Sequence, residues 1–426
     1  MRKVSSSATL VVLLIGTASA CGGNNQEEDL IPITFQSKWW PQAQFIGYYA
    51  AGGHPAEGSA APDVPTAAGA NFYAEEGLDV TVLPGANDVD PSLAVAQGDA
   101  DFGTDWSTNL LLAVQEKGLD LKHIAQVFQR SSFELVGMKS TFSTTDWSKI
   151  KAGAGNGKTR VGIWQTPGNE LPAQVCLNSH GITSPLDEGV KEADADVETQ
   201  RYAFAPSLVF PQDVDLASAM NYNELNQILA LKENAGEDDD GDGKTGEDPT
   251  FENGLEDLTR FKARDEGCGL LEDMIFTSQE LLDDPNFEGT GLTGREVAQR
   301  FLRATLKGWR WAINPNNQQQ ALQVALHFCE DFGESGSCSG GNLPGEQHQQ
   351  WQLQRVREQV QPGYAEGEDD VTVGCLDDNA YRQTLELLAP AEEYDDPQVG
   401  VGIIDANIGT DIVNKDLLSD IGVVCN

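Results

Sequence analysis

The sequence predicts an α/β fold of two lobes, each built on a doubly wound, mostly parallel sheet. Segments with the period of a strand alternate with helical segments from Leu30 onward, and this alternation is typical of parallel sheets flanked by helices. The alternation starts again at Arg160, which indicates a second unit of the same kind. The chain has 426 residues, more than one compact core normally holds, so we assign the two series to two lobes.

The elements of the first lobe follow one another in short steps. Residues 30–35 predict a first strand, and a helix begins at 45–51 before a Gly-, Pro- and Ala-rich insertion at 52–69. A helix at 72–77 ends at a glycine, and residues 78–83 alternate like a strand before a Pro-Gly break. The pattern then predicts helices at 91–97 and 107–116 and strands at 100–103, 121–128 and 133–138.

The second lobe and the return to the first lobe follow the same logic. A strand at 160–164 leads into a helix at 172–179, and a strand-and-helix passage is expected between 214 and 231. After the return, apolar residues three and four apart predict helices at 296–313 and 318–328, which should pack on the first lobe.

The predicted boundaries divide the chain into a leader, a tether and two lobes joined by a hinge. The hinge strands are expected at Leu135–Met138 and Ile275–Ser278. The segments are 1–20 for the leader, 21–29 for the tether, 30–138 for the first part of the first lobe, 139–275 for the second lobe with an acidic insertion at 234–249, and 276–426 for the return and the C-terminal helices.

The first residues predict an export leader. Two cations, Arg2 and Lys3, precede an apolar run at 8–15, and small residues at 18–20 stand directly before Cys21. The run is too short to span a bilayer as a helix, and the small residues suit a peptidase, so we expect this segment to be removed. Cys21 would then carry a lipid at the start of the mature chain. The alternative is an ordinary secretory leader that leaves Cys21 as a free thiol.

The remaining cysteines form an even set, which an oxidising compartment would allow to pair. Cys329 and Cys338 flank a Gly- and Ser-containing loop that a disulfide could close, and we favour that pair. The pairing of Cys176, Cys268, Cys375 and Cys425 stays open. No cysteine pair has zinc-site spacing and the histidines are scattered, so no metal-catalytic centre is expected.

The charge of the chain excludes some classes of partner. The formal net charge is −40, which argues against a nucleic-acid groove or a polybasic membrane surface. No segment after the leader is apolar enough to cross a membrane. We expect a monomer that meets the membrane only through the lipid on Cys21.

An acidic stretch resembles half of a calcium loop. Asp238, Asp240 and Asp242 with Gly243 have the spacing of the first ligands, but Pro249 stands where a bidentate glutamate belongs. We therefore favour a solvated acidic loop over an ordered calcium site. A calcium-dependent structural lipoprotein stays open as an alternative. A nucleophilic hydrolase finds no support, since no Gly-x-Ser-x-Gly elbow is present.

The candidate binding residues follow the carboxyl ends of predicted strands, where open parallel sheets place their ligands. Tryptophans stack on flat rings, while amide and carboxylate groups fix the edge of a ring. The alternative is that each tryptophan is part of a core. The stacking candidates are Trp39, Trp40, Trp106 and Trp164, with Tyr48 and Tyr222 as walls. The candidates for edge recognition are Gln42, Gln44, Asp105, Gln129, Asn169, Glu170, Asn223 and Glu224.

Several segments together resemble a known family, the thiamine-pyrimidine-synthase-like branch of the periplasmic solute-binding proteins that serve ABC importers. The segments are 38–49, 72–80, 98–103, 124–131, 220–224, 307–309 and 348–352. The resemblance implies the type II fold of periplasmic binding proteins, with two α/β lobes joined by two crossing strands. It also implies a receptor that closes on a thiamine precursor, a related nitrogen heterocycle or a sulfonate and works with a permease and an ATPase. With the lipid predicted on Cys21, we expect this receptor to be anchored in the cell envelope, on the periplasmic or extracellular side of the membrane.

One branch of that family makes the thiamine pyrimidine and consumes pyridoxal phosphate held by a lysine and a histidine. The aligned positions here are Asp105 and Asn109, and a carboxylate cannot supply the amine of a Schiff base. The iron motif of that branch has no counterpart either. We therefore expect a receptor for a planar nitrogen heterocycle, without cofactor or catalysis, and keep a synthase-like enzyme as the alternative.

Overall fold

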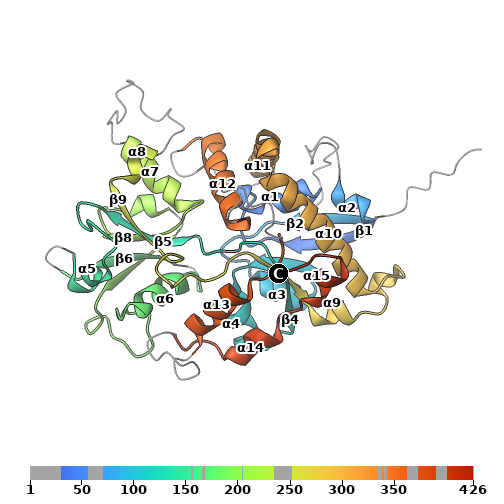
Figure 1. The fold of residues 1–426 in the computed structure, drawn as a ribbon, viewed down its shortest axis with the longest axis horizontal. Coiled ribbons are helices and arrows are strands. Elements are labelled where there is room, and N and C mark those ends of the chain that lie inside the picture. The colour runs from blue at the N-terminus through green and yellow to red at the C-terminus, as the bar shows by residue number, and fades with distance from the viewer. Residues whose placement is uncertain are drawn as a thin grey trace, which may run out of the picture.

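The structure is a computed structural model in which two α/β lobes lie side by side (Figure 1). It describes residues 30–55, 71–154, 157–165, 168–203, 205–234, 252–332, 338–339, 343–361, 373–389 and 401–425. The predicted leader with Cys21, the tether, most of the 52–69 insertion and the acidic stretch with Asp238, Asp240 and Asp242 lie outside these residues.

The first sheet has the strand order β2-β1-β3-β10-β4. Its strands are β1 (Ile31–Gln36), β2 (Leu78–Leu83), β3 (Phe102–Asp105), β4 (Leu121–Gln126) and β10 (Met274–Ser278). β1 pairs in parallel with β2 and β3, whereas β10 runs antiparallel between β3 and β4. The carboxyl ends of β1 and β3 therefore meet at one edge, and the residues that follow them lie close together.

The second sheet repeats this plan with the order β7-β6-β8-β5-β9. Its strands are β5 (Phe133–Met138), β6 (Arg160–Trp164), β7 (Glu198–Tyr202), β8 (Leu216–Met220) and β9 (Leu258–Lys262). β6 is parallel to β7 and β8, and β5 is antiparallel to β8 and β9. The predicted two-lobed α/β fold is confirmed, but the sheets are mixed because the strands at the crossings run against their neighbours.

The crossings between the lobes lie beside the predicted hinge strands. The chain passes from β4 to β5 through residues 127–132 and from β9 to β10 through residues 263–273. Leu135–Met138 is paired inside the second sheet and Ile275–Ser278 inside the first, so neither is a hinge, and the predicted boundary after residue 138 places β5 in the wrong lobe. An apolar run predicts a strand, but only its hydrogen-bonded partners decide which sheet it joins.

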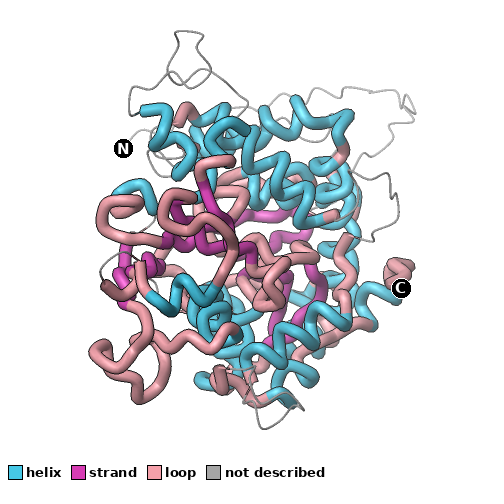
Figure 2. The backbone as a smooth tube through the Cα atoms, turned by 60° about the vertical axis from the view of Figure 1, so that its left-hand side comes forward, coloured by secondary structure: helices cyan, strands magenta, loops and turns pink. Residues whose placement is uncertain are grey.

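Helices cover both faces of the first sheet and surround the strands seen in Figure 2. They are η1 (Ala43–Phe45), α1 (Ile46–Ala50), α2 (Phe72–Glu75), α3 (Pro91–Gln97), α4 (Ser107–Lys117), α9 (Gln279–Asp283), η4 (Phe287–Gly289), α10 (Gly294–Ile313), η5 (Pro315–Asn317), α11 (Gln318–Phe332), α14 (Ala406–Asp411) and α15 (Asp416–Asp420). A capping box of Thr293 and Glu296 begins α10. α10 touches α1 backbone to backbone, because a Cβ on Gly308 would stand 2.2 Å from the carbonyl oxygen of Gly47.

The second lobe carries shorter helices, and two later helices join the lobes. Its helices are α5 (Trp147–Ala152), α6 (Leu171–Ser179), η3 (Pro206–Leu208), α7 (Glu224–Asn234) and α8 (Glu252–Leu255). α12 (Gly345–Val360) stands between α7 and α11 in Figure 1 and packs Trp351 among apolar side chains of the second lobe. α13 (Asp378–Leu388) lies beside the return crossing, where Leu271 N donates to Thr384 Oγ1 at 3.1 Å.

The described part of the chain contains three disulfides. The predicted Cys329–Cys338 bridge is confirmed. Cys176–Cys268 ties α6 to the return crossing, and Cys375–Cys425 ties the residues before α13 to the last turn of the chain.

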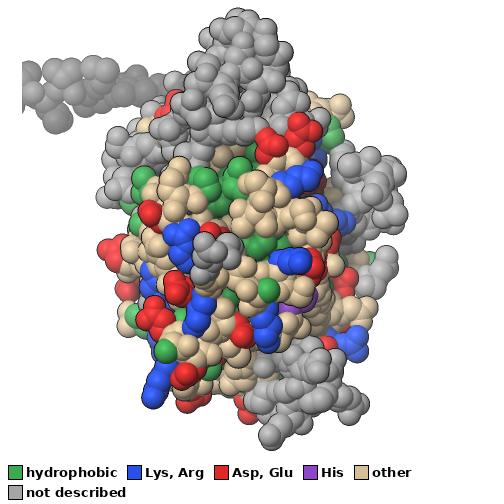
Figure 3. Space-filling model, turned by 90° about the vertical axis from the view of Figure 1, so that its left-hand side faces the viewer, with side chains coloured by type: hydrophobic (Ala, Val, Ile, Leu, Met, Phe, Trp, Pro, Cys, Tyr) green, Lys and Arg blue, Asp and Glu red, His purple; other side chains and the backbone are tan. Residues whose placement is uncertain are grey.

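The surface of the second lobe mixes charges of both signs. Figure 3 shows lysine and arginine side chains interspersed with aspartate and glutamate on the face turned to the viewer. Among the described helices, none combines the length and the apolar character that a bilayer span requires.

Candidate functional site

Asp105 is a fixed carboxylate at the edge where the first sheet meets the second lobe. It is the last residue of β3, and its Oδ1 accepts hydrogen bonds from Lys38 Nζ at 2.7 Å, from the backbone N of Trp106 at 2.7 Å and from Asn109 Nδ2 at 2.8 Å. Lys38 Nζ also lies 4.2 Å from the centroid of the Trp106 ring. The loop after β1 and the start of α4 are therefore held together around one carboxylate.

The same edge touches the second lobe through two aromatic rings and a glycine. Trp106 and Trp164, which ends β6, have ring centroids 6.0 Å apart with planes inclined by 56°. A Cβ on Gly168 would stand 2.7 Å from Asn109 Oδ1, so a side chain there would collide with the first lobe. The carboxyl ends of β3 and β6 thus face each other across the junction of the lobes.

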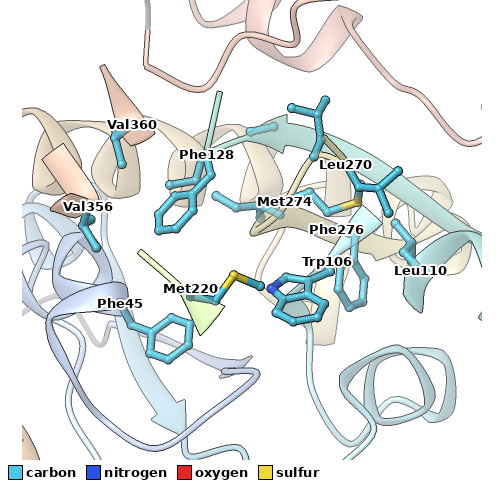
Figure 4. Close-up of a cluster of buried hydrophobic side chains, with 14 of the residues drawn as sticks. Phe45, Trp106, Leu110, Phe128, Met220, Leu270, Met274, Phe276, Val356 and Val360 are labelled. Carbon is cyan, nitrogen blue, oxygen red and sulfur yellow. The ribbon is translucent and has the colours of Figure 1, made fainter. Parts of the chain in front are cut away.

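Apolar side chains of both lobes fill the space beside these rings. Phe45, Trp106 and Met220 are part of one buried hydrophobic cluster, and in the view of Figure 4 Met220 of β8 lies between the other two. The lobes are therefore in contact, as expected for a closed arrangement.

Asp273 stands at the end of the return crossing and is buried. Gln44 Nε2 donates to its Oδ2 at 2.8 Å, while its Oδ1 has no partner among the described residues. Burial raises the pKa of Asp273 to about 7, an effect that Asp105 strengthens and that Gln44 and Lys38 oppose. Its φ of 41° is rare for a residue with a side chain, and such strain clusters at functional sites.

A chain of amides runs from the first lobe through α12 to the second lobe. Gln42 Nε2 donates to Gln44 Oε1 at 2.7 Å, and Gln352 Nε2 donates to Gln42 Oε1 at 2.9 Å. One turn earlier on α12, His348 Nε2 is 2.9 Å from Asn223 Oδ1 of the second lobe. These groups are buried or half-buried, and buried hydrogen bonds specify one relative placement of the parts they join.

His348 is neutral in this setting. Burial lowers its pKa to about 4. Asn226 Nδ2 lies 3.1 Å from Nδ1, and Asn223 Oδ1 and Gln352 Nε2 lie 2.9 Å and 3.0 Å from Nε2, so both ring nitrogens have hydrogen-bonding neighbours.

Two further carboxyl groups at the junction gain affinity for protons. Glu272 accepts hydrogen bonds from Ser131 Oγ at 3.0 Å and from Ser132 N at 2.7 Å, and these bonds join the two crossings. Burial raises the pKa of Glu272 to about 8. Glu224 accepts from Met220 N at 2.9 Å, and burial raises its pKa to about 7. Burial thus raises the pKa of Glu224, Glu272 and Asp273 alike.

Several predicted residues are brought together here. They are Gln42, Gln44, Asp105, Trp106, Trp164, Asn223 and Glu224. Glu170 lies at the start of α6, where Arg201 Nη2 donates to it at 3.3 Å, and Asn169 precedes it, half-buried.

Other predicted residues serve the core or the backbone. Trp39 and Trp40 are half-buried, and Trp39 packs against the core. The ring centroids of Tyr48 and Phe35 are 4.2 Å apart within the first lobe. Tyr222 meets the Phe128 ring edge to face. Gln129 Nε2 donates to the carbonyl oxygens of Gln126 and Cys375.

The prediction missed several residues of the junction. They are Lys38, Asn109, Asp273, His348 and Gln352. Lys38, His348 and Gln352 lie in segments that carry the family resemblance, which could have marked them. Asp273 precedes a strand rather than following one, so no rule about strand ends points to it. In the described part of the chain, no group of three or more His, Cys, Asp and Glu side chains is placed to hold a metal ion.

Comparison with known proteins places this geometry in a family. The family model described as NMT1/THI5 like matches residues 64–319, more than half of the chain. The chain belongs to the NMT1/THI5-like family. No curated protein matches this NMT1/THI5-like chain.

Solved structures share its fold at low sequence identity. A protein from Bordetella bronchiseptica RB50 has a TM-score of 0.51 at 14% identity, over 92% of this chain and 98% of that one. A structure from Methylobacillus flagellatus KT, described as the periplasmic sulfonate-binding protein SsuA of a sulfonate ABC transporter, has a TM-score of 0.50 at 13% identity, over 92% and 94% of the two chains. The likeness extends over both lobes and concerns the fold.

Proposed function

We propose that this protein is the solute-binding component of an ABC importer and encloses a small planar nitrogen heterocycle, such as a thiamine-pyrimidine precursor, between its lobes. The observation that carries the proposal is the chain of amides from Gln42 through Gln352 and His348 to Asn223, which brings polar groups of both lobes to one junction. Membership of the NMT1/THI5-like family and the fold shared with a sulfonate-binding protein support the same function.

The chemistry of the junction suits binding without reaction. A ligand that contacts Trp106 from one lobe and Trp164 from the other would favour the closed arrangement over an open one. A permease could then distinguish loaded from empty protein, and a cytoplasmic ATPase would drive transport. Asp105, where the related synthases carry a lysine, is held by three donors and acts as a fixed acceptor rather than as a nucleophile.

The test is a thermal-shift screen of the purified protein against aminopyrimidines, thiamine fragments, flavins and sulfonates, followed by calorimetric titration of any hit. We expect at least one heterocycle to raise the melting temperature, because a ligand that binds the folded state stabilises it by mass action. A screen without stabilisation, or the absorbance of a lysine-linked pyridoxal phosphate in the purified protein, would contradict the proposal.

We also propose that the mature chain is anchored through a lipid on Cys21, with the lobes on the outer side of the membrane. Expression of the whole precursor should give protein that enters the detergent phase, whereas Cys21→Ser should give protein in the aqueous phase. Equal partition of the two forms would overturn the anchor without affecting the binding proposal.

A further inference from the structure

Some buried polar atoms without a partner among the described residues belong to residues of the junction, and acceptors are more numerous among them than obligate donors. Among the described residues, no partner is present for Asp273 Oδ1, Asn109 Oδ1, Glu170 Oε2 or Gln352 Oε1. A buried acceptor without a donor costs free energy. A ligand that brings several donors would therefore gain more here than a ligand that brings acceptors.

Three of these acceptors belong to two hydrogen-bonded groups at the junction. Asn109 holds Asp105 through its Nδ2, while its Oδ1 faces the backbone of Gly168. Asp273 is bonded to Gln44, which connects through Gln42 to Gln352. The unpartnered atoms of Asn109 on one side, and of Asp273 and Gln352 on the other, thus belong to two hydrogen-bonded groups, and Asp105 of the first group is near enough to Asp273 of the second to influence its pKa.

Unpartnered donors in the region are fewer. Trp106 Nε1 is a buried donor without a partner among the described residues. The hydroxyls of Ser37, Thr104 and Thr108 are also unpartnered there, but a hydroxyl either donates or accepts, so it does not discriminate between ligands. The balance favours a ligand richer in donors than in acceptors.

The charges point the same way. The amine of Lys38 is already engaged with Asp105 at 2.7 Å, and both lie close enough to Asp273 to influence its pKa. A sulfonate would have to approach the carboxyls of Asp105 and Asp273 while the ammonium of Lys38 is already paired with Asp105, which costs free energy in a buried site. A cation or a neutral donor would be attracted to the same carboxyls.

We infer that the ligand of the proposed binding site presents an amidine-type edge, as an aminopyrimidine or an amidinium does, and that Asp273 Oδ1 accepts a hydrogen bond from that edge. This rests on the proposed function and narrows it, because it separates amidine-type ligands from sulfonates. Asp273 is then the residue that determines specificity, and Asn109 adds a second acceptor.

The test uses probes matched in size. Calorimetric titration compares two pairs of ligands. 4-Pyrimidinone has an exocyclic acceptor where 4-aminopyrimidine has a donor. Benzenesulfonate is an anion where benzamidine is a cation. We expect the first member of each pair to bind and the second to bind at least about tenfold more weakly, since a hydrogen bond to a charged group is worth about 1.5–3 kcal/mol. Asp273→Asn should lower the affinity for benzamidine by about 10- to 100-fold.

Asn109→Ala serves as a second variant, because it removes an acceptor without changing a charge and keeps the inference testable if Asp273→Asn fails to fold. Circular dichroism establishes that each variant is folded. Tighter binding of benzenesulfonate, or unchanged benzamidine affinity in a folded Asp273 variant, would overturn the inference and leave a solute-binding protein. Absence of binding by every probe and by the wider screen would overturn both the inference and the proposed function.

Discussion

Gln352 of α12 donates a hydrogen bond to Gln42 of the first lobe at 2.9 Å, while His348, one turn earlier on the same helix, bonds to Asn223 of the second lobe. Two side chains one turn apart on α12 thus form hydrogen bonds to the two different lobes. The relation of the lobes depends on this helix as much as on the two crossings.

His348→Ala should weaken the protein and its closed arrangement. It removes the acceptor of Asn226 Nδ2 and one of the donors to Asn223 Oδ1, and a buried unpaired group costs about 1–3 kcal/mol. Urea unfolding would measure the loss. Glu346→Ala, on the exposed side of α12, is the matched control and should change stability by less than about 0.5 kcal/mol. Equal stability of the two variants would show that the histidine does not hold the lobes.

Gly308→Ala should destabilise the first lobe. A methyl group there would stand 2.2 Å from the carbonyl oxygen of Gly47, so α10 would have to move away from α1. Such overpacking costs about 1–3 kcal/mol. Lys307→Ala, one residue earlier with an exposed ion pair to Glu75 at 3.3 Å, should cost at most about 1 kcal/mol. Thermal unfolding compares the two, and a larger loss for Lys307→Ala would refute this account of the packing.

Glu272→Gln should flatten the dependence of stability on pH. Burial raises the pKa of Glu272 to about 8, so the folded protein keeps a proton that the unfolded chain releases above its ordinary pKa of about 4. The resulting stabilisation is complete below about pH 4 and is lost as the pH rises toward 8, by up to roughly 1 kcal/mol per pH unit.

Urea unfolding at steps between pH 4.5 and 8.5, a range set by those two pKa values, would measure the slope. Glu346→Gln makes the same chemical change on the exposed side of α12 and should follow the parent protein. Parallel curves for Glu272→Gln and the parent would mean that Glu272 is not the group that binds the proton.

Removal of Cys176–Cys268 should cost more stability than removal of Cys329–Cys338. The first bridge spans 92 residues and the second 9, and the loop-entropy relation gives about 4.6 and about 2.6 kcal/mol. Double alanine variants unfolded in urea under oxidising conditions would measure both costs. The reverse order would show that local packing, not the closed loop, sets the contribution of these bridges.

The sequence predicts the positions of strands in which apolar residues alternate. It does not predict which sheet a strand joins, because that depends on the strands with which it pairs. Residues 78–83, 133–138 and 160–164 form strands with the predicted bounds. The membership of Phe133–Met138 in the second sheet depends on β8 and β9, which lie far along the chain, so no local pattern reveals it.

The candidate site was predicted in part for a similar reason. Strand ends led to Gln42, Gln44, Asp105 and Trp106, because parallel strands carry their following loops to one edge. α12 escaped prediction because it buries His348, Gln349 and Gln352 where an ordinary core helix buries apolar residues. An apolar period cannot identify a helix whose inner face is made of amides.

The bridge between Cys176 and Cys268 fixes α6 to the return crossing five residues before Asp273. A rotation of the second lobe against the first would therefore have to be absorbed between residues 269 and 273, together with 127–132 on the other crossing. A small backbone rotation within so short a segment would displace the far end of the second lobe by a larger distance, and the carboxylate proposed to meet the ligand would then lie beside the axis of that rotation.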